Sequence, residues 1–342
     1  MSLLLHKNVF THSLLSLLLL CLLLITSNSS IDPYKALNII LNPNGTLTRF
    51  NKPPQSPPSP HHSPVSVLSK DLTINPSKPT WARIYLPRHH SHRKLPLIVF
   101  FHGGGFIFDS AASTYFHDFC VRVANFTESV VVSVDYRLAP EHRLPAAYDD
   151  SVEALHWIKA TDDKWLTRHA DYSRCYLMGE SAGGNIAYNA GLRVAAAEFD
   201  DVRPLKIRGL ILIQPFFGGS KRTSSELRLE QNKNMTLPLE ITDLMWNLSL
   251  PVGADRDHVY SNPTAHDCSK VLDRMRVLGW RVAVFGCDGD PLVDREMQLV
   301  NLLRGKGVHV VGQFYPGGRH GIFIGDPSMS NKVYDLITTS FH

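Results

Sequence analysis

A serine between small residues is the strongest chemical signal in the chain. The stretch Gly179-Glu-Ser181-Ala-Gly183 follows an apolar run that begins at Tyr176, and it leads into an alanine-rich helical pattern. A G-x-S-x-G turn between a strand and a helix holds a hydroxyl in a strained, exposed position, where the helix amino terminus favours developing negative charge. Ser181 is therefore a candidate nucleophile for acyl transfer, although a glycine-rich turn of this kind can also be purely structural.

A second glycine cluster lies about eighty residues upstream, where His102-Gly-Gly-Gly105 follows the apolar run Val99–Phe101. Glycine lets backbone N–H groups approach a substrate oxygen closely, and such donors can hold the oxyanion of a tetrahedral intermediate. A flexible turn is the alternative, but finding both motifs at strand ends favours an oxyanion hole. Its expected donors are the N–H groups of Gly103, Gly104, Gly105 and Ala182.

A catalytic triad with this nucleophile turn needs a carboxylate and then a histidine further along the chain. Asp288 and Asp290 follow the apolar run Val282–Phe285, and His320 follows Val308–Phe314. Loops at the carboxyl ends of parallel strands meet at one edge of the sheet, so these side chains can reach the serine. A lone loop aspartate or histidine is usually structural, and it is the order of the three along the chain that favours a triad.

Taken together, these motifs resemble a known family. The pair His102-Gly-Gly-Gly105 and Gly179-Glu-Ser-Ala-Gly-Gly-Asn185 resembles the hormone-sensitive-lipase-like branch of the α/β-hydrolases. The stretch from Asp135 to Asp150 (DYRLAPEHRLPAAYDD), together with Asp32-Pro-Tyr-Lys35, resembles the plant carboxylesterases of that branch. The resemblance extends from Ile31 to the carboxyl terminus and rests on several motifs in fixed order.

The resemblance implies a carboxylesterase that hydrolyses small to medium carboxylic esters through a Ser181–His320–Asp290 triad and an acyl-enzyme, without a cofactor or metal. It implies that Asp290 is the acid, with Asp288 as second candidate, and that Asp294 caps the following helix. Independently of the resemblance, Asp135, Tyr136, Arg137 and Glu141 are expected to brace neighbouring loops by hydrogen bonds, as charge-rich loops after a central strand usually do. Glu180 stands where many plant members have Asp.

Two other functions exist among similar plant proteins. Dehydratases or cyclases use the same pocket for elimination, and the sequence leaves this alternative open. Gibberellin receptors keep the fold and bind without turnover, but they lack the catalytic histidine and have serine at the third glycine. This chain has His320 and Gly105, which disfavours a receptor.

Short apolar runs alternate with helical patterns along most of the chain, which predicts an α/β fold with a mostly parallel, doubly wound sheet. Residues 81–342 are expected to form the α/β-hydrolase domain, with a cap insertion at about 215–280 that contains an amphipathic segment around Leu237–Leu248. Residues 28–80 are expected to form an N-terminal cap segment and a proline-rich linker. The expected strands are Leu97–Phe101, Val130–Val134, Tyr176–Met178, Ile207–Ile213, Val282–Phe285 and Val308–Phe314, and the expected helices are Ala146–Thr161, Ala182–Ala197, Arg295–Lys306 and Asn331–Thr339.

Composition and charge indicate which classes of binding partner to expect. The 342 residues are 44% hydrophobic and 19% charged, which is typical of one large globular domain. The net charge of +4 comes from scattered lysines and arginines, so no nucleic-acid footprint is indicated. The 17 histidines and 5 cysteines lack the spacing of metal ligands, and a small-molecule ester is the expected partner.

The first residues carry a separate signal. The run Leu14–Ile25 is apolar except for Ser16, which is too short to span a bilayer comfortably but matches a signal-peptide core. Residues 1–27 are therefore expected to be a cleaved signal peptide, or else an uncleaved anchor that would make the membrane a partner. A secretory or extracellular location is expected, with the cytoplasm as the alternative. Sequons at Asn44, Asn125, Asn234 and Asn247 are consistent with a glycoprotein.

Overall fold

The computed structural model describes residues 31–60, 65–89, 93–197, 201–230, 237–265 and 267–341. The expected signal peptide or anchor and the sequon at Asn234 lie outside the described residues. The strands are β1 (Ile39–Leu41), β2 (Leu47–Arg49), β3 (Val67–Asn75), β4 (Thr80–Pro87), β5 (Leu95–Phe101), β6 (Val130–Asp135), β7 (Ala170–Glu180), β8 (Ile207–Ile213), β9 (Arg281–Cys287) and β10 (His309–Tyr315). The helices are α2 (Pro33–Ala36), α3 (Thr114–Phe126), α4 (Ala146–Ala160), α5 (Lys164–His169), α6 (Ala182–Ala196), α7 (Ser224–Glu230), α8 (Leu239–Ser249), α9 (Ser269–Val277), α10 (Val293–Gly305), α11 (Ile322–Gly325) and α12 (Pro327–Thr339).

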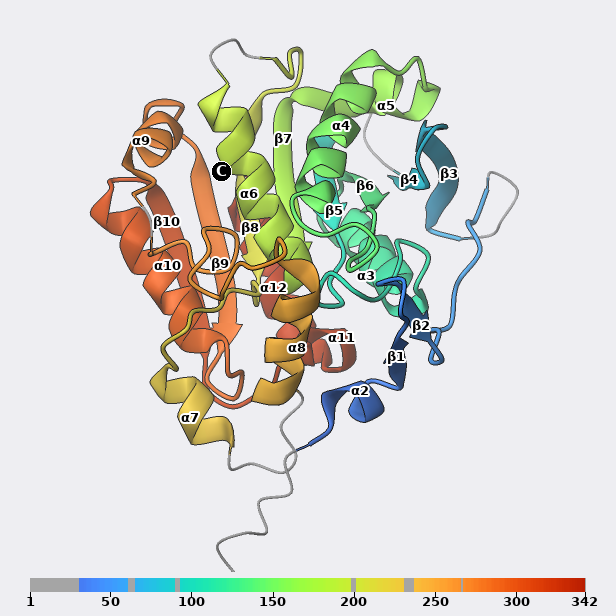
Figure 1. Ribbon diagram of the computed structural model, residues 1–342. Coiled ribbons are helices and arrows are strands. Elements are labelled where there is room, and N and C mark those ends of the chain that lie inside the picture. The colour runs from blue at the N-terminus through green and yellow to red at the C-terminus, as the bar shows by residue number, and fades with distance from the viewer. Residues whose placement is uncertain are drawn as a thin grey trace, which may run out of the picture.

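Within the described residues, one sheet of eight strands has the order β10-β9-β8-β7-β5-β6-β4-β3 (Figure 1). Neighbouring strands from β10 to β6 run parallel, while β4 and β3 continue the sheet in the antiparallel direction. The predicted mostly parallel sheet is therefore confirmed, and all six expected strands are present. The carboxyl ends of the parallel strands lie at one edge, where a ligand site of this fold is expected.

The sheet begins before Trp81, where the sequence analysis placed the start of the domain. Strand β3 pairs with β4 from Val67 opposite Pro87 onward, and β4 pairs with β6. β3 is an edge strand whose residues from Lys70 onward are mostly polar or partly exposed, so it lacks the continuous apolar run of a buried parallel strand. The described part of the proline-rich segment, residues 52–60, forms no helix or strand, and it is attached to the sheet domain, because the carbonyl of Ser56 accepts a hydrogen bond from Arg83.

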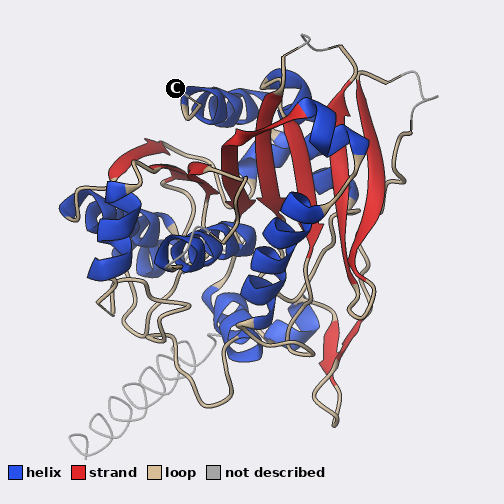
Figure 2. Cartoon of the chain, turned by 90° about the horizontal axis from the view of Figure 1, so that it is seen from above, coloured by secondary structure: helices blue, strands red, loops and turns tan. Residues whose placement is uncertain are grey.

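The two faces of the sheet are covered by different helices, as Figure 2 shows. Along β5, Val99 and Phe101 point to the core under α4, α6 and α10, whereas Ile98 and Phe100 point to the core under α3 and α12. This alternation follows from the two-residue period of a strand. All four side chains are fully buried, so the strand ends that carry the candidate residues are held by a closely packed core.

The insertion between β8 and β9 contains α7, α8 and α9. Helix α8 matches the amphipathic segment expected around Leu237–Leu248, and it contacts the N-terminal helix α2. Figure 1 shows these two elements side by side at one end of the molecule. Helix α9 instead packs on α6, with Leu272 and Met275 in the main core, so this part of the insertion extends the helical layer.

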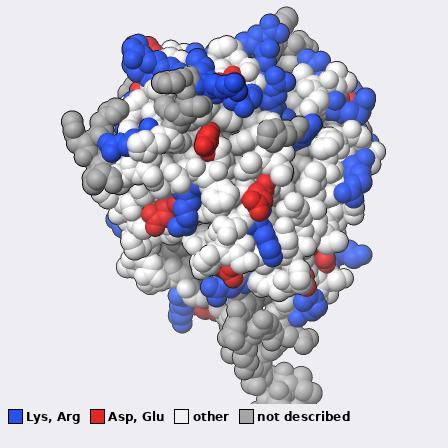
Figure 3. Space-filling model, turned by 180° about the vertical axis from the view of Figure 1, so that it is seen from behind, with Lys and Arg blue, Asp and Glu red and all other residues white. Residues whose placement is uncertain are grey.

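The surface carries charges of both signs. On the face shown in Figure 3, basic and acidic side chains are interspersed, with basic ones more numerous along the upper margin. None of the helices within the described ranges is long and apolar enough to cross a membrane.

Candidate active site

Ser181 occupies the sharp turn between β7 and α6. Its φ of 53° and ψ of −119° are strained for a non-glycine residue, which is characteristic of a nucleophile turn. The neighbouring glycines are needed for space. A Cβ at Gly183 would lie 1.9 Å from the carbonyl oxygen of Phe101, and one at Gly179 would lie 2.0 Å from that of Gly183. The sequence motif therefore encodes a backbone that larger residues would disrupt.

The structure brings Ser181 together with the expected histidine and acid. The distance between His320 Nε2 and Ser181 Oγ is 2.9 Å, and His320 Nδ1 lies 2.7 Å from Asp290 Oδ2. His320 follows β10 and Asp290 follows β9, and these strands are neighbours in the sheet. A neutral His320 that donates its Nδ1–H to the carboxylate leaves Nε2 free to accept the serine proton.

The three aspartates of the loop have different environments. Asp290 is fully buried, and its second oxygen, Oδ1, accepts the backbone N–H of Leu292. Asp288 is exposed and accepts the backbone N–H of Gly317 at 2.5 Å, which joins two loops. The expectation that Asp294 caps the following helix is wrong, because α10 begins at Val293 and its N-cap, Leu292, makes no side-chain cap hydrogen bond. The carboxylate of Asp294 instead accepts the N–H of Ser225 in α7 at 2.7 Å. A contact between residues 69 positions apart leaves no local sequence signal.

Electrostatics favour a charged imidazole. Burial by itself lowers the pKa of His320, but the charge and hydrogen bond of Asp290 and the charge of Glu180 outweigh burial and raise the pKa to about 9. Glu180 Oε1 lies 3.7 Å from His320 Nε2, and burial raises the pKa of this carboxyl to about 7. At neutral pH the resting histidine is therefore mainly protonated.

The glycine loop has the geometry of a donor site. Gly104 and Gly105 have φ values of 92° and 60°, which residues other than glycine rarely adopt. Within the described residues, the amides of Gly104, Gly105 and Ala182 donate to no acceptor. Gly103 packs against Glu180, since a Cβ there would lie 2.1 Å from Glu180 Oε2. Of the three loop glycines, Gly104 and Gly105 line the cavity beside the serine.

His102 supports the loop. Its ring is fully buried, stacks on Tyr136 at a centroid distance of 4.3 Å, and donates from Nδ1 to the carbonyl of Gly103 at 3.0 Å. Burial lowers the pKa of His102 to about 4, so the ring is neutral at physiological pH. The Tyr136 hydroxyl donates to the His102 and Gly103 carbonyls. The expected bracing role of the segment after β6 is confirmed, because Glu141 also pairs with Arg49.

A cavity of about 180 Å³ opens beside Ser181 and His320. Much of its wall is apolar and comes from several elements: Phe116, Phe216, Leu237, Met245 and Ile324. Met245 lies on α8, so the insertion contributes to the wall as expected of a cap. The same methionine meets the glycine loop, because a Cβ at Gly105 would lie 2.2 Å from its sulfur.

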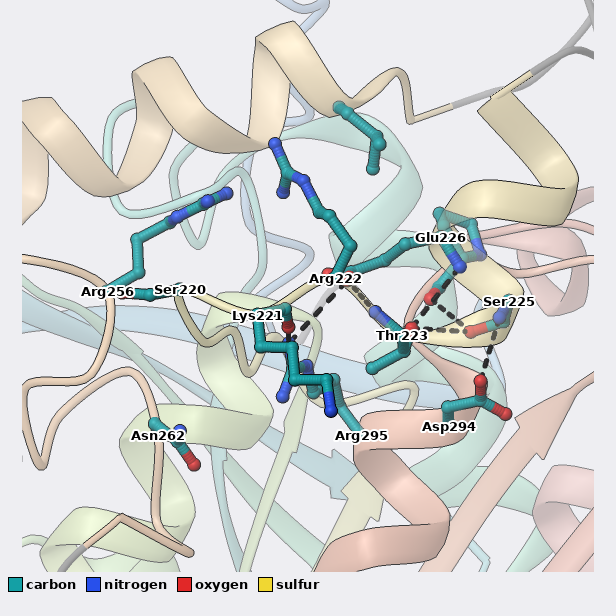
Figure 4. Close-up of polar contacts among 12 residues, drawn as sticks. Ser220, Lys221, Arg222, Thr223, Ser225, Glu226, Arg256, Asn262, Asp294 and Arg295 are labelled. Carbon is teal, nitrogen blue, oxygen red and sulfur yellow. Dashed lines mark hydrogen bonds and ion pairs between the residues drawn. The ribbon is translucent and has the colours of Figure 1, made fainter.

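Polar contacts attach the start of the insertion to the segment that follows Asp290. The N–H and Oγ of Ser225 donate to Asp294 and to the Pro291 carbonyl at 2.7 Å and 2.8 Å. Figure 4 shows this cluster, in which Arg295 of α10 also donates to the carbonyl of Lys221. The cap insertion and the loop that carries Asp290 are therefore mechanically connected.

One residue of the site, Gln214, was missed by sequence reasoning. It is fully buried directly after β8, and its Nε2 donates to Asp290 Oδ2 at 2.7 Å. The same amide contacts both neighbours of the histidine, donating to the Arg319 carbonyl at 3.2 Å and accepting the Gly321 N–H at 2.8 Å. Its position at the carboxyl end of a central strand is the signal that could have identified it.

We expect Gln214→Leu to lower kcat by up to about 100-fold with little change in KM, because the histidine loop loses two hydrogen bonds and Asp290 loses one, and a small displacement of a reacting group is costly. Steady-state kinetics with a nitrophenyl ester measure both constants. Gln298→Leu on the exposed side of α10 is the matched control. A KM defect with normal kcat would show that Gln214 does not position the catalytic groups.

Comparisons with known proteins identify the family of the chain. The family model described as alpha/beta hydrolase fold matches residues 98–324, and the chain belongs to this family. Carboxylesterase 20 of Arabidopsis thaliana is 50% identical over 311 residues, which cover 89% of this chain and 94% of that protein. A 2-hydroxyisoflavanone dehydratase of Glycyrrhiza echinata is 35% identical over 307 residues, covering 86% and 90%.

The solved esterase of Pyrobaculum calidifontis has a TM-score of 0.68 and 29% identity, and the match covers 83% of this chain and 85% of that one. The expected resemblance is therefore confirmed: the chain is a plant carboxylesterase of the hormone-sensitive-lipase-like branch. As an enzyme it is a carboxylic ester hydrolase.

Proposed function

We propose that the protein hydrolyses small to medium carboxylic esters through a Ser181–His320–Asp290 triad and an acyl-enzyme. The observation that carries this proposal is the continuous hydrogen-bonded chain from Ser181 Oγ through His320 to Asp290, with distances of 2.9 Å and 2.7 Å. The cavity of about 180 Å³ beside the serine can hold the acyl or the alcohol part of a small to medium ester.

In the proposed reaction, His320 Nε2 takes the proton of Ser181 as Oγ attacks the ester carbonyl carbon. The developing oxyanion is held by backbone N–H groups of the glycine loop and by that of Ala182. The tetrahedral intermediate collapses to the acyl-enzyme when His320 gives its proton to the departing alkoxide. Water then attacks the acyl-enzyme by the same steps, and the acid leaves with Ser181 reprotonated.

The alternative is elimination by the same groups, since a dehydratase is among the relatives. Two measurements separate the functions. A fluorescent phosphonate ester should label the enzyme once, at Ser181, because it mimics the tetrahedral state. A series of nitrophenyl esters of increasing chain length should be turned over many times. Labelling without ester turnover would favour elimination, and failure of both would remove the proposed mechanism.

The activity should depend on pH in a way set by His320. Only the neutral imidazole accepts the serine proton, so kcat/KM should rise with pH and reach half its maximum near pH 9, the raised pKa of this group. Glu180→Gln removes one negative charge beside the imidazole and should move this midpoint to lower pH, whereas Glu180→Asp should move it less. Ser181→Ala serves as the blank for spontaneous hydrolysis, and an activity that is constant down to pH 6 would contradict the prediction.

We further propose that the protein enters the secretory pathway. Support comes from the apolar run Leu14–Ile25 and from the sequon residues Asn44, Asn125 and Asn247, which are all exposed. Expressed in plant cells, the mature chain should begin between about residues 26 and 31 and lose mass on glycosidase treatment. Amino-terminal sequencing that finds Met1 on an unglycosylated protein would overturn this.

A further inference from the structure

The cavity beside Ser181 is acidic. Asp109 and Glu180 both line it, and within the described residues no lysine or arginine contributes to its wall. Glu180 is only 4% exposed, and its carboxylate receives no hydrogen bond from the described part of the chain. The contact of 3.7 Å between Glu180 and His320 Nε2 is too long for a hydrogen bond. Because Glu180 lines the cavity, a ligand bound there can supply the hydrogen bonds that its carboxylate lacks.

Asp109 is held in place against the glycine loop. Its φ of 74° is in the left-handed region, which aspartate tolerates better than most residues. A Cβ at Gly104 would lie 2.8 Å from Asp109 Oδ2, so the carboxylate lies beside the expected oxyanion donors. Asp109 accepts a hydrogen bond from Ser113 Oγ at 3.3 Å. This donor is neutral, so the contact does not balance the negative charge of the carboxylate.

These two carboxylates oppose the proposed chemistry unless something offsets them. The oxyanion of the tetrahedral intermediate is a new negative charge that forms near Asp109 and, above the raised pKa of Glu180 of about 7, near a second carboxylate. The His320 imidazolium, which is present at that stage, offsets the charge of Glu180, while that of Asp109 still repels the oxyanion. A cation on the substrate would be attracted by the carboxylates and would also reduce this repulsion. The rings of Tyr115, Phe116 and Phe216 line the same cavity, and aromatic faces attract cations.

We infer that the cavity selects esters that carry a positively charged nitrogen, such as a protonated amine, whose charge lies against Asp109 and Glu180. This inference rests on the proposed ester hydrolysis and specifies its substrate class. A protonated amine fits best, because its N–H groups supply the hydrogen bonds that the Glu180 carboxylate lacks.

Pairs of esters that differ only in charge test this inference. For the acyl part, 4-nitrophenyl 4-(trimethylammonio)butanoate is compared with 4-nitrophenyl 5,5-dimethylhexanoate, which replaces the nitrogen by carbon. For the alcohol part, 2-(dimethylamino)ethyl butanoate, whose protonated amine carries one N–H, is compared with 3-methylbutyl butanoate. In at least one pair, kcat/KM should be more than about tenfold higher for the cationic ester, since a charge pair in a partly buried site readily supplies that factor.

Asp109→Asn should lower the cationic-to-neutral ratio of kcat/KM to below about one third of its original value. Asp118→Asn, on the exposed side of α3, makes the same change of charge outside the cavity and should leave the ratio unaltered. If Asp109→Asn does not fold, competitive inhibition of neutral ester hydrolysis by tetramethylammonium chloride, against sodium chloride at equal ionic strength, replaces it. Selective inhibition by the ammonium ion is the expected result.

The outcomes distinguish failure of this inference from failure of the proposed ester hydrolysis on which it rests. Hydrolysis of the neutral esters without preference for the cationic ones, or an equal loss of preference in Asp109→Asn and Asp118→Asn, would overturn the substrate class and leave the esterase proposal intact. Absence of turnover with every ester, together with absence of phosphonate labelling at Ser181, would instead overturn the proposed function itself.

Discussion

Replacing Ser181 by alanine is expected to lower kcat for a nitrophenyl ester by a factor of about 10³ or more. The reason is that alanine keeps the backbone of the turn but lacks the oxygen that His320 Nε2 contacts at 2.9 Å. The glycine loop and the cavity remain, so the residual rate should still exceed that in water. Thermal unfolding and circular dichroism should change little, because the lost group is a single hydroxyl.

His320→Ala should be as damaging, since the serine then has no base. Groups that act as a unit are not additive, so the double variant Ser181→Ala/His320→Ala should be no slower than the worse single variant. The exposed residue His142 provides a control, because His142→Ala changes the same side chain outside the cavity. Near-normal turnover by a folded Ser181→Ala protein would remove the serine mechanism.

The parts of the site that the sequence predicts are those encoded locally. The nucleophile turn is one example, since Gly179 and Gly183 are required by contacts that would otherwise place a Cβ within about 2 Å of a carbonyl group. The order of strands along the chain was sufficient to place Asp290 and His320 at the same edge of the sheet. The edge strand β3 was missed because its exposed positions are polar, and this pattern resembles a loop.

Contacts between distant segments account for the rest. Gln214 has no motif around it, and its role arises only because the loops of Asp290 and His320 fold over the end of β8. In the same way, the free-histidine reference pKa of about 6.5 gives no sign of the raised pKa of His320. That shift depends on two carboxylates that come from different strands, Asp290 after β9 and Glu180 at the end of β7.

The choice of acid can be tested directly, and Asp290→Asn is expected to lower kcat by about 10³- to 10⁴-fold, whereas Asp288→Asn should cost less than about tenfold. Oδ2 of Asp290 accepts from both His320 and Gln214, while Oδ1 accepts the N–H of Leu292. Either orientation of an asparagine amide therefore places an N–H₂ group against another donor. With the N–H₂ toward the imidazole, the favoured tautomer carries its proton on Nε2 and cannot accept from the serine.

Asp288 lacks this role. Within the described residues, its exposed carboxylate accepts one hydrogen bond, from the backbone N–H of Gly317. The amide oxygen of an asparagine can accept the same hydrogen bond. The pH profile adds a second readout. Asp290 raises the pKa of His320, so any residual activity of Asp290→Asn should have its midpoint at lower pH than the parent enzyme. Asp288→Asn should retain the parent midpoint. Equal, small losses in both variants, with unchanged pH profiles, would mean that Asp290 is not the acid that orients His320.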